Sequence, residues 1–174
     1  MWAKAVGFLT RSGDDGIGDV ADLCGVRADD PSDPASIQAA FNDPLVLDTA
    51  LFELGWLDRF VDLAGDLLPP GEYDLLDEWT HARRDLFRVE RIEGDAVVLV
   101  RLDGDLEIRL AESLPGRSPS VGEHWCIRPL RVGERWYAPG GALRLDEDEL
   151  DEANDVLEDP FTFCEWLAEV RPLR

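Results

Sequence analysis

A histidine and a cysteine lie two positions apart, at His124 and Cys126, in a largely apolar stretch. Residues two apart in a β-strand point to the same face of the sheet, so the imidazole could take a proton from the thiol and activate it as a nucleophile. A cysteine next to Trp125 in a strand is also ordinary hydrophobic core. We therefore predict no catalytic residue, and an enzyme acting through Cys126 and His124 is the weaker alternative.

Metal chemistry is not predicted from the sequence. The chain has two histidines, His81 and His124, and its three cysteines are far apart. Structural zinc sites use closely spaced Cys or His pairs, and calcium loops alternate acidic ligands around a central glycine. Neither spacing occurs, so we predict no metal site and no cofactor.

Charge is the most unusual property of the sequence. The chain has 38 acidic and 17 basic residues, a formal net charge of -21, and residues 146–159 hold nine carboxylates and no base. Such a field repels nucleic-acid phosphates and acidic membrane surfaces and attracts basic proteins, although it could also serve only solubility. We predict a basic protein partner, with direct nucleic-acid or membrane binding disfavoured. The predicted partner-binding residues are Asp146, Glu147, Asp148, Glu149, Asp151 and Glu152.

Tryptophan and arginine together suggest a different kind of site. The chain has six tryptophans, and two of them fall on a predicted pair of strands around Val132. Aromatic rings interleaved with arginines on a small barrel can stack bases or grip a peptide. The alternative prediction is therefore a face that binds a small molecule or nucleic acid, formed by Trp125, Trp136, Arg128 and Arg131.

The elements that must position these residues begin with helices. Asp-Pro pairs suit the N-cap and first turn of a helix, and the pairs at positions 33–34, 43–44 and 159–160 are predicted to start helices. From Leu45 to Val61 apolar residues recur mostly every three or four positions, which predicts one long buried helix or two short ones separated at Gly55. Another helix is predicted from Glu72 to about Arg83.

From Leu86 onward the pattern changes to short strands separated by turn signals. They are predicted to be successive and antiparallel, and to form a small barrel or strongly curled sheet, because a short β unit must protect its edges. The acidic run after this sheet is predicted to be a solvated helix or a linker. The predicted strands cover residues 87–92, 96–102, 106–110, 124–132 and 135–138.

The predicted fold class is α+β. It combines an N-terminal helical segment over residues 1–83, a small antiparallel β-barrel or curled sheet over 84–145, and an acidic segment with a C-terminal docking helix over 146–174. We expect these parts to form one compact unit.

Several short features occur between about Asp48 and Leu130. They are Leu51-Phe52-Glu53-Leu54-Gly55, Leu67-Leu68-Pro69 with Glu72, then Trp79, Arg84, Phe87 to Glu90, and Val121-Gly122-Glu123. In these features the segment resembles uncharacterised actinobacterial proteins known through a zinc-binding SEC-C motif. The Cys-x-Cys run of that motif has no counterpart in this chain, so the resemblance implies only an architecture, a helical segment leading into a small β-barrel.

The predicted function is that of a non-enzymatic interaction module that engages a basic partner, as antitoxin, immunity and nuclease-inhibitor proteins would. An odd number of cysteines suits reduced thiols better than a disulfide framework. The sequence shows neither a signal-peptide pattern nor an apolar run of the roughly 20 residues needed to span a bilayer. We predict a bacterial cytoplasmic protein, and the sequence does not predict its oligomeric state.

Overall fold

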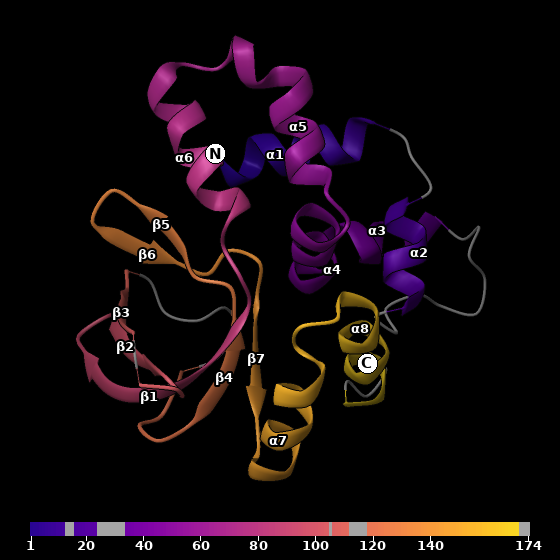
Figure 1. Ribbon diagram of the computed structural model, residues 1–174. Coiled ribbons are helices and arrows are strands. Elements are labelled where there is room, and N and C mark those ends of the chain that lie inside the picture. The colour runs from indigo at the N-terminus through magenta and orange to yellow at the C-terminus, as the bar shows by residue number, and fades with distance from the viewer. Residues whose placement is uncertain (13–15, 24–33, 105, 112–117, 171–174) are drawn as a thin grey trace. The chain divides into compact units, whose positions relative to one another are not determined.

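Helices form one unit of this protein and a curled sheet forms most of the other. The computed structural model describes residues 1–12, 16–23, 34–104, 106–111 and 118–170 (Figure 1). The chain divides into two compact units, Met1–Thr80 with Glu158–Arg174, and His81–Leu157. The fold class is α+β, as predicted. Among the described residues, no helix combines the length and the apolar character needed to cross a membrane.

The helical unit combines the N-terminal helices with the C-terminal helix of the chain. Its C-terminal helix packs against the second helix of the chain, which buries Phe163, Cys164 and Trp166. The prediction of a helix starting at Asp159-Pro160 is confirmed, and Asp159 caps it by accepting hydrogen bonds from the next turn. The elements of this unit are α1 (Trp2–Arg11), α2 (Gly16–Leu23), α3 (Pro34–Asn42), α4 (Pro44–Asp48), η1 (Thr49–Glu53), α5 (Trp56–Ala64), η2 (Gly65–Leu67), α6 (Pro70–Thr80) and α8 (Pro160–Val170).

The apolar run from Leu45 to Val61 forms two α-helices, the second of the two predicted alternatives. Asp43 starts α4 by accepting hydrogen bonds from the amides of Leu45 and Val46 at 2.9 and 3.1 Å. The π-helical turn η1 follows, and Gly55 with φ 73° separates it from α5. Only glycine adopts that left-handed conformation without steric cost, so Gly55 sets the point of separation.

The second unit is a seven-stranded sheet followed by one helix. The strands are β1 (Asp85–Glu93), β2 (Ala96–Arg101), β3 (Glu107–Leu110), β4 (His124–Ile127), β5 (Leu130–Val132), β6 (Arg135–Tyr137) and β7 (Ala142–Leu145), and the helix is α7 (Glu147–Val156). The spatial order is β5-β6-β3-β2-β1-β4-β7. The sheet curls into a half-barrel (Figure 1), which confirms the predicted curled sheet.

Alternate residues of four strands, β1 to β4, build the core inside the curl. Phe87, Val89, Val97, Leu99, Ile108, Leu110, Trp125 and Ile127 form this buried cluster. The register between β1 and β2 shifts between Val89 and Arg91, so Glu90 is an extra residue that bends β1. Such a bend is one way to curl a sheet.

The prediction of one strand from His124 to Val132 is wrong. This run is two strands on different parts of the sheet: β4 lies between β1 and β7, whereas β5 is an edge strand beside β6. Proline has no amide hydrogen to offer a neighbouring strand, and Pro129 lies at the break. The strands are also not all antiparallel, because β6 joins β3 in parallel through Leu110 and Trp136. Strand β7 was not predicted.

Candidate functional site

Helix α7 carries the predicted acidic surface and begins with a capping box. The carboxylate of Asp146 accepts hydrogen bonds from the amides of Asp148 and Glu149, and the carboxylate of Glu149 accepts one from the amide of Asp146 at 2.8 Å. Acids in a first turn also interact favourably with the positive end of the helix dipole. Of the two predicted alternatives for the acidic run, a solvated helix or a linker, the structure has the helix, and residues of its own first turn cap it.

One side of α7 is apolar and packs inside its own unit. Ala153 is fully buried, Leu150 and Val156 are partly buried, and α7 contacts the preceding strand β7. These three residues recur every three positions, which places them along one side of a helix. Because this side is covered, the residues on the opposite side of α7 must face water.

The opposite side of α7 is a continuous arc of carboxylates, which we call the α7 acidic face. All five of its members are exposed, and α7 contains no basic residue. Four of the six predicted partner-binding residues belong to this face, whereas Asp146 and Glu149 are engaged in the cap. Asp155 was missed from the sequence, although its position four residues after Asp151 could have identified it. The members are Glu147, Asp148, Asp151, Glu152 and Asp155.

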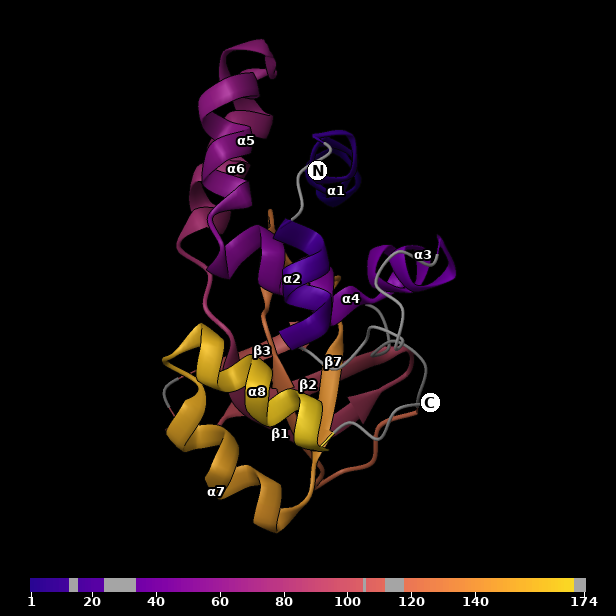
Figure 2. The ribbon, with the colours of Figure 1, turned by 90° about the vertical axis from the view of Figure 1, so that its right-hand side faces the viewer.

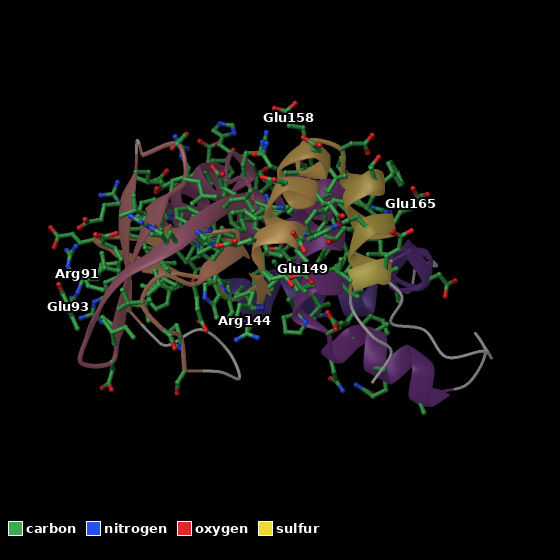
Figure 3. All side chains as sticks on the ribbon, turned by 90° about the horizontal axis from the view of Figure 1, so that it is seen from below. Arg91, Glu93, Arg144, Glu149, Glu158 and Glu165 are labelled. Atoms are coloured by element: carbon green, nitrogen blue, oxygen red, sulfur yellow. The ribbon has the colours of Figure 1, made fainter. Side chains whose placement is uncertain are left out.

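The acids of the sheet differ from those of α7, because arginines form ion pairs with them. Arg91 donates to both oxygens of Glu107 at 2.9 and 3.1 Å and to Glu93 at 2.7 Å, and Arg109 also reaches Glu93 at 3.2 Å. Figure 3 shows Arg91 and Glu93 next to each other at the outside of the sheet. Both arginines lie opposite Val98 in the strand register, and Val98 is fully buried. Their aliphatic stems therefore help to cover the outer face of β2.

Hydrogen bonds and burial change the pKa of the sheet acids in opposite directions. The hydrogen bonds from Arg91 lower the pKa of Glu93 and Glu107. The amide of Ser120, followed by Arg144 and the nearby indole of Trp125, lowers the pKa of Glu123. Burial raises the pKa of Asp85, at the start of β1, despite the opposing Leu86 amide and Arg101. These four carboxylates thus make contacts within the sheet unit itself.

The alternative ligand face is not assembled as predicted. Trp125 is 1% exposed and belongs to the core of the curl, and Arg128 is 2% exposed and donates to the carbonyl oxygen of Ala82 at 2.8 Å. Trp136 is partly buried against the same core, and the guanidinium of the exposed Arg131 lies 5.9 Å from its ring centroid. Only two of the four residues therefore meet near solvent, and they contact each other.

The possible nucleophile does not reach the surface. Cys126 is buried in β4, and His124 at the start of the same strand is partly buried. Cys164 is buried in the helical unit, and Cys24 lies outside the described residues. Within the described ranges, no three or more His, Cys, Asp or Glu side chains are placed to hold a metal ion.

Comparison with protein-family models, with curated proteins and with solved structures gave no match for this chain. The resemblance to SEC-C proteins over residues 48–130 therefore stays a prediction, and the function must be argued from the surfaces described above.

Proposed function

We propose that this protein is a non-enzymatic interaction module that binds a basic surface of another protein through the α7 acidic face. The observation that supports the proposal is the contrast between the two groups of acids. On the sheet, Glu93 and Glu107 are paired with Arg91, whereas Glu147, Asp148 and Asp151 make no side-chain ion pair within the described part of the chain. Unpaired carboxylates on one side of a rigid helix suit a complementary cationic partner.

The size of the expected effect follows from exposed ion pairs. Each contributes roughly 0.2–1 kcal/mol, so neutralising three carboxylates should weaken binding about threefold to a hundredfold. Their attraction at a distance also speeds association and is screened by salt. Antitoxin, immunity and nuclease-inhibitor proteins would use this chemistry, with carboxylates in positions that nucleic-acid phosphates otherwise take.

The test uses the full-length protein as bait in a lysate of its source organism, at about 50 and 300 mM NaCl, with bound proteins identified by mass spectrometry. The test variant combines Glu147→Gln, Asp148→Asn and Asp151→Asn, and it leaves the cap residues Asp146 and Glu149 unchanged.

The matched control is a variant that neutralises three other exposed carboxylates, Glu158, Glu165 and Glu169, as glutamines. Figure 3 labels two of them, Glu158 and Glu165. We expect a basic protein to be retained at low salt, released at high salt, lost by the α7 variant and kept by the control. Equal retention by both variants, or equal loss from both, would contradict the proposal.

A further inference from the structure

Two leucines on the helical unit are exposed to an unusual degree. Leu63 in α5 is 64% exposed and Leu67 in η2 is 84% exposed. They are four residues apart, and each follows an exposed aspartate, Asp62 or Asp66. Leu63 lies in the last turn of α5 and Leu67 ends the 3-10 turn that follows, so the two exposed leucines are close together in the chain at the end of α5, each beside an exposed aspartate.

The fold of the α5 and α6 hairpin does not need these leucines. The buried residues of α5 are Trp56, Leu57 and Phe60, and Leu63 follows Phe60 by three positions, at the edge of the same side and beyond the last buried residue of the helix. Tyr73 of α6 packs on Gly65, with a ring carbon 3.0 Å from where a Cβ would stand. Figures 1 and 2 show α5 and α6 side by side, and the two helices are in contact. Leu63 and Leu67 are thus available without disturbing this packing.

The charge around the leucines indicates the kind of partner. Residues 56–80 contain seven acids and one base, a balance of -6. The single base, Arg59, lies over the ring of Trp56 at 4.7 Å from its centroid. A second copy of this chain would bring the same negative charge to the surface, and nucleic acid would be repelled too. A cationic partner with its own apolar row is complementary.

We propose that Asp62, Leu63, Asp66 and Leu67, the α5 stripe, dock an amphipathic basic helix of another protein. Apolar side chains of that helix pack against Leu63 and Leu67, and its lysines or arginines reach Asp62 and Asp66. Two helices packed in this way lie about 8–10 Å apart. The α5 stripe differs from the α7 acidic face because it offers apolar as well as acidic contacts. We therefore treat it as a second binding surface.

The test measures fluorescence anisotropy of a labelled synthetic peptide, two repeats of Leu-Lys-Lys-Leu-Leu-Lys-Leu, with the full-length protein. A peptide of the same composition, shuffled so that its leucines no longer share a helical face, controls for charge alone. We expect the amphipathic peptide to bind at least about tenfold more tightly than the shuffled one, because only the first presents a continuous apolar side to Leu63 and Leu67.

Three variants decide where the peptide binds. L63S/L67S should weaken binding of the amphipathic peptide about tenfold or more, and L102S/V121S, which changes two exposed apolar residues of the sheet unit, should not. D62N/D66N should reduce the salt dependence and keep the preference for the amphipathic peptide. If L63S/L67S binds as tightly as the unmodified protein, or if only the α7 variant loses the peptide, the α5 stripe is not the docking surface.

Discussion

Arg128 and Arg131 are three residues apart, yet they have opposite roles. Arg128 is buried and joins the start of the sheet unit to β4 by its hydrogen bond to Ala82, whereas Arg131 is exposed on the edge hairpin and donates to the carbonyl oxygen of Gly133. A buried guanidinium is stable only when its donors are satisfied. Arg128 is therefore a structural residue rather than part of a ligand surface.

We expect Arg128→Ala to lower the free energy of unfolding by about 2–4 kcal/mol, because it removes a charged hydrogen bond and leaves a cavity. Arg131→Ala should change it by less than about 1 kcal/mol, as exposed substitutions usually do. Urea denaturation at pH 7 measures both. Equal costs would show that Arg128 does not hold the sheet unit as described.

The lowered pKa of Glu93 and Glu107 predicts an acid-sensitive contribution to stability. Since the folded protein holds these protons more weakly than the unfolded chain, this contribution is present above the ordinary glutamate value of 4.5 and is lost as pH falls through the folded values. An E93Q/E107Q variant should therefore lose less free energy of unfolding on acidification from pH 6 to pH 3 than the unmodified protein does.

The control for that experiment is D95N/E134Q, which neutralises two exposed turn carboxylates that form no ion pair within the described ranges. Its free energy of unfolding should fall with acid as steeply as that of the unmodified protein. A variant at Glu93 and Glu107 that is as acid-sensitive as the control would mean that the pairs with Arg91 do not stabilise the fold.

At the scale of elements, the junction before α5 depends on one glycine. Gly55 has φ 73° and an added Cβ would meet nothing within 4 Å, so any cost of substitution is conformational and not steric crowding. Gly71, at the start of α6, is equally open, but its backbone lies outside the left-handed region. A comparison of alanine substitutions at Gly55 and Gly71 therefore isolates the cost of the backbone conformation, because neither added Cβ would be crowded.

We expect Gly55→Ala to lower the free energy of unfolding by about 1–2 kcal/mol, the cost of a left-handed L-residue. Gly71→Ala should be neutral or stabilise by up to about 1 kcal/mol, because alanine restricts the unfolded chain and favours helix. Thermal and urea unfolding of both variants provide the comparison. A stabilised Gly55→Ala would mean that the junction adopts another conformation.

Helix α7 uses two of its acids to start the helix and others to present a surface. Asp146 and Glu149 satisfy backbone amides at its first turn, while Asp151 and Asp155 take no part in the cap. Substituting a cap residue costs roughly 0.5–2 kcal/mol of stability, so a loss of binding after such a change would have two explanations. Variants at the exposed positions avoid this ambiguity.

At the scale of the whole molecule, a charge of -21 should make stability depend on salt. Repulsion among unpaired carboxylates opposes the compact state, whereas salt also weakens the ion pairs on the sheet. Because 38 acids face 17 bases, repulsion is the larger effect. The free energy of unfolding in urea should therefore rise between about 0.05 and 0.5 M NaCl, over which the screening length shortens from about 14 Å to about 4 Å. A decrease would show that ion pairs dominate.

The fold could be predicted largely where the signal is local. Asp43-Pro44 and Asp159-Pro160 start helices because their caps satisfy amides within one turn, and the short apolar run from Ala96 to Val100 between turn residues marks a strand. The acidic surface was predictable for the same reason, since a helix with a capping box and an apolar row at Leu150 and Ala153 leaves its acids toward water. The missed residue Asp155 follows from that periodicity.

The sequence by itself therefore determined the α+β class, the helix starts at Asp43-Pro44 and Asp159-Pro160 and the position of the acidic run, because each depends on residues within a few positions of one another. Only the tertiary structure decided that β4 and β5 lie on different parts of the sheet, that β6 joins β3 in parallel, and that Trp125 and Arg128 are buried. Those outcomes depend on strands distant in sequence, since a strand's pattern shows which residues share a face but not which partner will cover it.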